Sequence, residues 1–312
     1  MTSLQDRPAA GLYVAAWLLS GVGLGLLILA LQAGPPLRGV LLMIALALLI
    51  VGLAAGAGYQ IVSRRTRPAQ AFSGPSPLLL LGLQFVVVNT ISLVLLLIGV
   101  PGTDSPIGFF IAAALLLAAY VGVVWLFGIR SGALTWRGIG LPDRPSLGRL
   151  LGDIGVGGGF LLVVAVTASL LGGLLARFLD TSAPEVVPPP DTPAGILLVA
   201  LGAVVLLPIG EELFFRGYSL TAWRQDMGER SALLRSTLFF ALVHIGTLTS
   251  STFEAGARQA LLVVVVIAPV GYALGWLFLR RGLVAAIAGH AAFNGFAILV
   301  TVLAQHLPPP GT

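Results

Sequence analysis

Apolar residues in this chain come in long runs separated by short polar breaks. The runs are near or above about 20 residues, the length at which a helix rising about 1.5 Å per residue spans a hydrocarbon core of about 30 Å. Turn-forming pairs such as Gly34-Pro35, Arg67-Pro68 and Pro101-Gly102 separate them. The pattern predicts an all-α polytopic transmembrane helix bundle of about nine spans (eight to nine) at residues 11–32, 38–62, 77–100, 106–129, 149–176, 194–222, 231–250, 258–279 and 282–305.

Composition supports this interpretation and narrows the source. Hydrophobic residues make up 57% of the 312 residues, charged residues make up 9%, and the mean hydropathy is +1.02. A soluble domain carries about 25% charged residues, so a soluble globular enzyme is excluded. All 17 basic residues are Arg, which indicates a GC-rich genome, and we therefore expect a multi-pass protein of a bacterial cell (inner) membrane. The absence of Cys excludes disulfides, thiolate metal sites and a Cys nucleophile.

The arginines predict the topology. They are scattered through short loops without a basic stripe, which argues against a nucleic-acid partner. Cytoplasmic loops accumulate Arg, and alternating nine spans from a cytoplasmic N-terminus puts thirteen Arg inside and three outside. The inside set is Arg7, Arg64, Arg65, Arg67, Arg130, Arg137, Arg144, Arg149, Arg224, Arg230, Arg235, Arg280 and Arg281, and the outside set is Arg38, Arg177 and Arg258. The acidic segment with Glu185 and Asp191 falls outside as well.

Ionisable groups within the spans are the candidates for chemistry, because such groups cost several kcal/mol unless they are paired or face a cavity. Glu212 and Arg216 are four residues apart and share a helix face, so we expect a structural ion pair. Glu211 lies about 100° away and lacks a partner on its own helix, which suits a general base. Pro208 should interrupt the helical hydrogen bonds just upstream.

Two later spans contribute the remaining polar groups. His244 lies in the seventh predicted span, and His290 and Asn294 are neighbours on one face of the ninth. Measured from the cytoplasmic helix ends, Glu211 and these three residues fall at depths of roughly 12 to 20 Å. We therefore expect them to line one pocket that is reached from the cytoplasmic side.

At these residues the chain resembles the CAAX-protease and bacteriocin-processing family of intramembrane proteases, also called the Abi or type II CAAX prenyl endopeptidase family. The matching motifs are Glu-Glu-x-x-x-Arg at 211–216, Phe-x-x-x-His at 240–244 and His-x-x-x-Asn at 290–294, within about residues 190–300. The resemblance implies that Glu211 and His244 activate a water, while His290 and Asn294 stabilise the developing oxyanion. It also leaves two options for the cofactor. Glu211, His244 and His290 could hold a Zn2+ ion, or a glutamate mechanism could operate without metal.

The resemblance implies an intramembrane endopeptidase that cleaves a membrane-associated, lipidated or bacteriocin-like peptide or protein near the cytoplasmic face, with membrane lipids as its other partners. Two alternatives stay open: a non-catalytic scaffold or immunity protein with a protease-like site, and a proton-coupled transporter built on the buried Glu and His. We expect three parts: a four-helix N-terminal unit of unknown role at 1–129, a cytoplasmic loop at 130–148, and a five-helix protease-like core at 149–306.

Overall fold

The computed structural model describes residues 8–65, 68, 71–184, 187–190, 192–248 and 252–306. In that part of the chain the regular structure is helical, without a strand, and eight helices are long and apolar enough to cross a membrane. The predicted all-α multi-pass membrane protein is confirmed. The eight are α1 (Ala10–Gln32), α2 (Leu37–Arg64), α3 (Pro77–Leu97), α4 with its π-helical extension η2 (Pro106–Ile129), α5 (Leu147–Phe178), the compound span α6–α8 (Pro193–Met227), α10 (Phe253–Arg281) and α11 (Leu283–His306).

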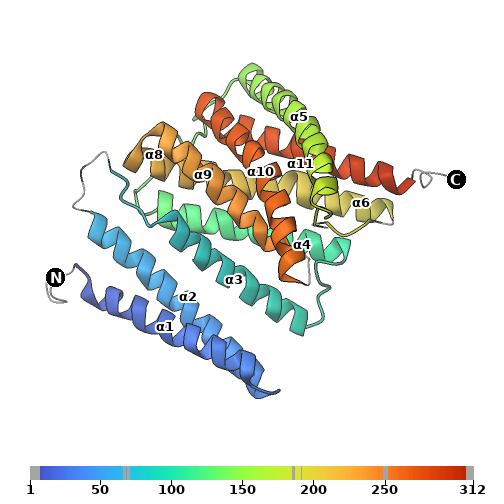
Figure 1. Cartoon of the computed structure of the whole chain (residues 1–312). Coiled ribbons are helices and arrows are strands. Elements are labelled where there is room, and N and C mark those ends of the chain that lie inside the picture. Colours follow the sequence, from blue (N-terminus) through green and yellow to red (C-terminus); the bar gives the residue numbers. More distant parts are fainter. Residues whose placement is uncertain are drawn as a thin grey trace. The chain divides into compact units, whose positions relative to one another are not determined.

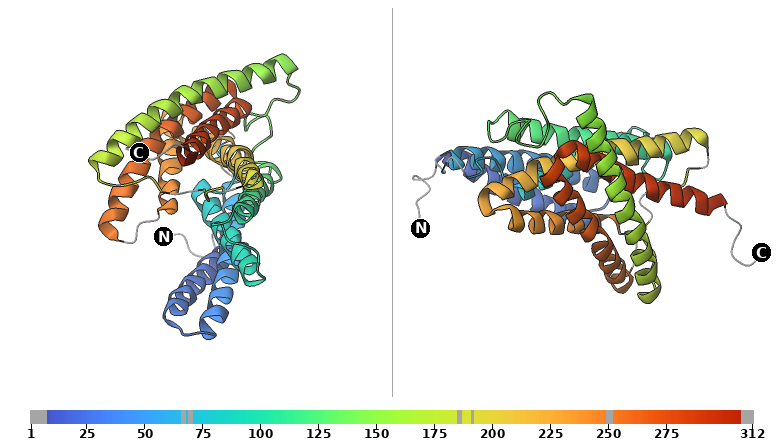
Figure 2. Two further views of the ribbon diagram at one scale, coloured as in Figure 1. Left: turned by 90° about the vertical axis from the view of Figure 1, so that its right-hand side faces the viewer. Right: turned by 90° about the horizontal axis from the view of Figure 1, so that it is seen from above.

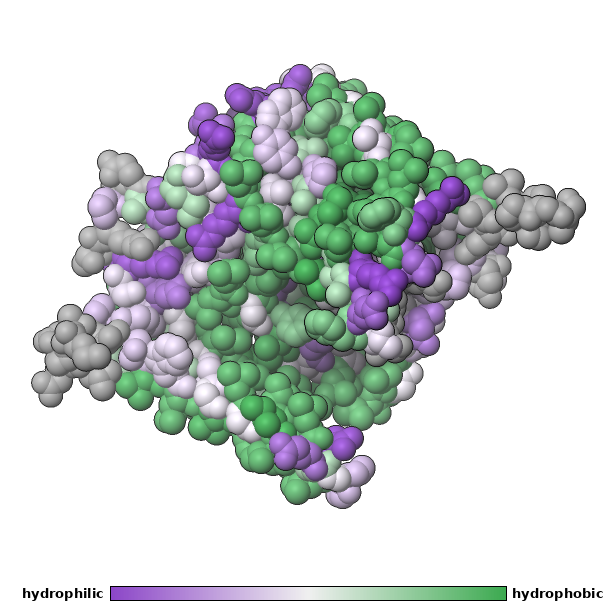
Figure 3. Space-filling view, viewed as in Figure 1, coloured by the Kyte–Doolittle hydropathy of each residue, from purple (hydrophilic) through white to green (hydrophobic). Residues whose placement is uncertain are grey.

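The assignment of each loop to the cytoplasmic or the outer side of the membrane stays a prediction. Four of the residues that entered it, Arg7, Arg67, Glu185 and Asp191, lie outside the described residues. In Figure 3 most of the visible surface is hydrophobic, and the hydrophilic residues gather in separate patches. Helices that face lipid need such an apolar surface. Their backbone polar groups need no partner outside the helix, because they are hydrogen-bonded within it.

The seventh predicted span is shorter than expected. Helix α9 (Glu229–Val243) has 15 residues and continues into a 3-10 turn, η5 (His244–Thr247). Fifteen residues rise about 22 Å, which is less than the hydrocarbon thickness of about 30 Å. Helix α9 is therefore not one of the eight helices that are long and apolar enough to cross a membrane.

Contacts around α10 show how the chain runs past this short helix. At the start of α10, Arg258 donates to the Leu179 carbonyl at 3.3 Å, beside the end of α5. At the other end of α10, the Leu283 amide donates to the Gly140 carbonyl at 3.1 Å, in the loop that precedes α5. Helices α5 and α10 are therefore antiparallel, and both pack against α11 (Figures 1 and 2).

The described chain forms two compact units. The first comprises residues up to Val100 together with Ala118–Thr135. Its α1 and α2 run side by side (Figure 1), and their packing depends on small residues. A Cβ at Gly23 would lie 2.9 Å from Leu49 Cγ, and one at Gly52 would lie 2.5 Å from Ser20 Oγ. Close approach of small residues is the usual basis of helix association in lipid.

The second unit comprises Pro101–Leu117 and the chain from Trp136 onward. Its α5 and α11 approach so closely that a Cβ at Gly157 would clash with the Ala285 carbonyl, and one at Gly289 would lie 2.9 Å from Leu161. Phe109, Val199 and Ala203 form a buried apolar cluster beside the first half of the compound span. All six candidate site residues lie in this unit. The predicted division into a four-helix unit at 1–129, a loop at 130–148 and a protease-like core at 149–306 stays a prediction.

Candidate functional site

The compound span that carries Glu211 and Glu212 is irregular on both sides of them. α6 (Pro193–Ala200) leads into the π-helical segment η3 (Leu201–Leu206), then α7 (Leu207–Glu212), a second π-helical segment η4 (Leu213–Leu220) and α8 (Thr221–Met227). π-Helical turns widen a helix and are frequent at functional sites. The two carboxylates therefore lie at the end of α7, a short α-helical segment between two widened, π-helical ones.

Pro208 explains where Asn294 binds. In the π-helical register the Leu207 amide bonds to the Gly202 carbonyl, so the next carbonyl, that of Ala203, would need a donor at position 208. Proline has no N–H to give. Asn294 supplies the donor instead, through an Nδ2 bond of 2.8 Å to the Ala203 oxygen. The interruption that the sequence predicts at Pro208 thus positions Asn294.

Glu212 and Arg216 form the ion pair that their spacing predicts. Arg216 Nη1 donates to Glu212 Oε1 at 2.7 Å, and both side chains are fully buried. The guanidinium also donates through Nη2 to the Gly271 carbonyl at 3.1 Å, and its Cζ lies 4.2 Å from the centre of the Phe240 ring. A buried ion pair needs such additional partners, because its mutual attraction alone does not offset the loss of hydration. Arg216 thereby links the compound span to α9 and α10.

His290 lies between the two carboxylates. Its Nδ1 is 2.8 Å from Glu212 Oε1, and its Nε2 is 3.8 Å from Glu211 Oε2. Because Glu212 already accepts from Arg216 as a carboxylate, His290 Nδ1 is the donor of their bond. The ring is fixed by that bond, and its second nitrogen faces Glu211, whose side chain is 14% exposed.

His244 is positioned by its own helix end. Its Nδ1 lies 2.8 Å from the Phe240 carbonyl, which can only accept, so Nδ1 carries the proton and Nε2 is the acceptor nitrogen. The His244 ring lies 4.5 Å from the Phe240 ring, centre to centre, and the His290 ring lies 5.8 Å from it. Phe240 therefore contacts the rings of both histidines.

The structure does not gather the predicted zinc ligands. Over the described residues, no three His, Asp or Glu side chains are close enough together to hold a metal ion. Glu211, His244 and His290 in this arrangement do not fit a Zn2+ site.

An apolar cavity of about 450 Å³ adjoins His244. It lies among α5, α10 and α11, and its wall on α5 consists of small residues that include Ala168, Gly172 and Gly173. Phe293, next to Asn294 on α11, also lines it. The cavity thus connects the histidine to space that suits an apolar chain.

Sequence reasoning did not find Gly271 as a contributor to the site. A Cβ at this position would lie 3.1 Å from Phe240 Cδ1, so the glycine lets α10 pass close to Phe240 and offers its carbonyl to Arg216. The available signal was Pro269 two residues earlier, inside the α10 helix, because a proline within an apolar span marks a break in helical bonding.

Comparison with known proteins agrees with the motifs. Residues 193–296 match the family model of type II CAAX prenyl endopeptidase Rce1-like proteins. No curated protein matches the chain, and no solved structure does. The matched range begins at α6 and ends two residues after Asn294, so it contains all six candidate site residues. The resemblance seen in the motifs is confirmed by this match: residues 193–296 of this membrane protein are similar to the Rce1-like type II CAAX prenyl endopeptidases.

Proposed function

We propose that this protein is an intramembrane endopeptidase that hydrolyses a peptide bond of a lipidated, membrane-associated peptide or protein. The observation that carries the proposal is the position of Glu211, whose Oε2 lies 3.8 Å from Nε2 of His290. The orientation of the His290 ring is held by Glu212, which is itself paired with Arg216. The family match supports a CAAX-type intramembrane protease.

Glu211 acts as the general base. Its carboxylate takes a proton from a water, the hydroxyl oxygen adds to the carbonyl carbon of the peptide bond, and the carbonyl oxygen becomes an oxyanion. When the tetrahedral intermediate collapses, the C–N bond breaks and Glu211 returns the proton to the leaving nitrogen. The products are a new carboxyl terminus and a new amino terminus.

His290 and Asn294 stabilise the oxyanion. His290 takes this role when its ring is doubly protonated, because its Nδ1 already donates to Glu212. In that form Nε2 is a donor, directed to the region beside Glu211 where the oxyanion forms. Asn294 Nδ2 has a second N–H besides the one given to Ala203. Donors that are fixed in advance contribute about 2.7–4 kcal/mol each to such transition states.

His244 assists from the cavity side. With Nδ1 donating to Phe240, its Nε2 can accept a hydrogen bond from the attacking water and orient it. The apolar cavity beside it supports an apolar chain of the substrate, such as a lipid group or an aliphatic side chain, as the part that is bound.

The test uses the full-length protein in liposomes with a quenched fluorescent peptide that carries a farnesylated cysteine, and with the same peptide without the lipid. We expect cleavage of the lipidated peptide and a loss of at least about 100-fold in rate for Glu211→Gln. Glu229→Gln, an exposed glutamate at the start of α9, is the matched control and should keep the wild-type rate.

Other outcomes point to the alternatives. A wild-type rate in Glu211→Gln would exclude the proposed base. If the wild type cleaves neither peptide, and Glu211→Gln replaces the wild type in cells without loss of its function there, the protein is a scaffold or immunity factor. Proton flux that depends on a transported solute in the same liposomes would identify a transporter.

A further inference from the structure

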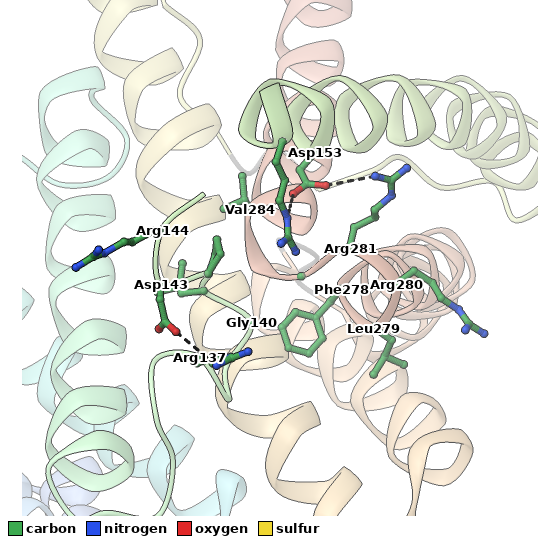
Figure 4. A pocket seen from close by; sticks show the side chains of 14 residues that line it. Arg137, Gly140, Asp143, Arg144, Asp153, Phe278, Leu279, Arg280, Arg281 and Val284 are labelled. Carbon is green, nitrogen blue, oxygen red and sulfur yellow. Dashed lines mark ion pairs between the residues drawn. The ribbon is translucent and has the colours of Figure 1, made fainter. Parts of the chain in front are cut away.

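A cleft of about 770 Å³ lies at the end of the second unit where α5 begins and α10 ends. Its walls are the 137–144 segment, the first turns of α5, and the turn between α10 and α11 (Figure 4). The walls are held together by main-chain contacts, because Leu283 donates to the Gly140 carbonyl at 3.1 Å. Gly140 and Gly282 have φ values of +86° and +93°, which other residues rarely adopt. The cleft is therefore a built feature of the fold.

The cleft is strongly basic. Five arginines and two aspartates line it. Asp153, whose side chain is only 8% exposed, lies 3.8 Å from Arg149 and 3.5 Å from Arg281. One carboxylate thus pairs with two guanidinium groups, and the three groups together carry one net positive charge. In Figure 4 Arg144 and Arg280 extend outward on opposite sides, so they form the rim.

Arg137 is the remaining cation of the cleft. It pairs with Asp143 at 3.7 Å, and both side chains are exposed. An exposed pair of this kind contributes about 0–1 kcal/mol, so it is readily exchanged for a stronger anion. The excess positive charge therefore belongs to the Arg149–Asp153–Arg281 group and the two rim arginines.

The surroundings place the cleft at headgroup level. On α10 the side chains of Tyr272, Trp276 and Arg280 follow one another at four-residue spacing, and all three are exposed. Exposed Tyr and Trp followed by Arg mark the passage from hydrocarbon to headgroups. On α5 the exposed Val156 and Phe160 follow Arg149 on the same helix face, and Phe160 packs against Trp276, so an apolar surface begins on the side of the guanidinium groups.

We propose that this cleft binds the headgroup of an anionic phospholipid, with the phosphate on the guanidinium groups of Arg149 and Arg281 and the acyl chains along Val156 and Phe160. Basic pockets between transmembrane helices suit such headgroups. Arg side chains bind phosphate oxygens with charge-assisted, often bidentate hydrogen bonds. A free phosphate offers the same charge without the chains, and the apolar surface of α5 distinguishes the two. The site is separate from Glu211 and its neighbours and does not depend on peptidase activity.

The test measures the melting temperature of the full-length protein in a neutral detergent as lipid is added. We expect dioleoylphosphatidylglycerol to raise it, with dioleoylphosphatidylcholine and inorganic phosphate having little effect. The triple variant Arg149→Gln/Asp153→Asn/Arg281→Gln removes both cations without leaving Asp153 as a buried charge. It should need about tenfold more dioleoylphosphatidylglycerol for the half-maximal rise.

Arg224→Gln/Arg230→Gln is the control, since it removes two exposed arginines outside the cleft lining. It should bind like the wild type. Equal effects of the two variants, or equal effects of the two lipids, would overturn the proposal. So would a rise with inorganic phosphate alone, which indicates a phosphate site, or competition by a peptide with a free but not an amidated C-terminus, which indicates a peptide site. If the triple variant does not fold, Arg281→Gln alone should still weaken binding by a few-fold.

Discussion

His290 Nδ1 and Glu212 Oε1 are joined at 2.8 Å although the two residues are 78 positions apart in the chain. The glutamate oxygen that orients the histidine is the same one that Arg216 holds at 2.7 Å. The orientation of His290 therefore depends on an ion pair that is fully buried in another helix.

Loss of Arg216 should destabilise the protein because it leaves Glu212 as a buried charge without its cation. We expect Arg216→Met to lower the free energy of unfolding by about 3 kcal/mol or more, the typical cost of removing one member of a buried pair. Unfolding in denaturing detergent, followed by circular dichroism, measures this. Glu212→Gln/Arg216→Met should be more stable than Arg216→Met alone, and a double variant that is less stable would contradict the account.

Pro208 and Asn294 should be energetically coupled through the Ala203 carbonyl. Asn294→Leu leaves that buried carbonyl without its donor, and we expect a cost of about 1–3 kcal/mol. Pro208→Ala restores a backbone N–H that can serve the same oxygen, so Asn294→Leu should cost less in that background. A double-mutant cycle of unfolding free energies checks this, and simple additivity would rule out the proposed competition.

A methyl group at Gly271 should disturb catalysis more than folding. The new Cβ of Gly271→Ala would press on Phe240, against which His244, His290 and Arg216 all pack. We expect kcat to fall about tenfold with KM little changed, because displacement of catalytic groups mainly affects the transition state. Gly159→Ala, where a Cβ meets nothing within 4 Å, is the control. Equal kcat values for the two variants would argue against a role for Phe240.

Removal of metals should leave the activity intact. The described residues bring no three metal-ligating side chains together, so we expect purified protein that elemental analysis finds free of zinc to cleave the lipidated peptide at the wild-type rate. Treatment with 1,10-phenanthroline should have no effect. Stoichiometric zinc together with chelator inhibition that added Zn2+ reverses would instead support the three-ligand site.

Local spacing in the sequence predicted the parts of the site that lie within one helix. The Glu212–Arg216 pair follows from four-residue spacing, and the approximate positions of the membrane spans follow from run length. The contact from Arg216 to the Gly271 carbonyl could not be read in this way, because it depends on the path of α10 past α9. The π-helical stretches were also missed, since they depend on how the span packs around Pro208. Hydropathy overestimated the length of α9 because it does not register the helix end at Val243.

The hydrogen bond from His244 to the Phe240 carbonyl has one more consequence. The last carbonyls of a helix lack intrahelical donors, and His244 Nδ1 caps one of those at the end of α9. The same imidazole is thus a structural cap through one nitrogen and a candidate reactive group through the other. Turning the ring to use the opposite nitrogen would leave the Phe240 carbonyl without this donor, so the end of α9 selects the tautomer of His244 that carries its proton on Nδ1.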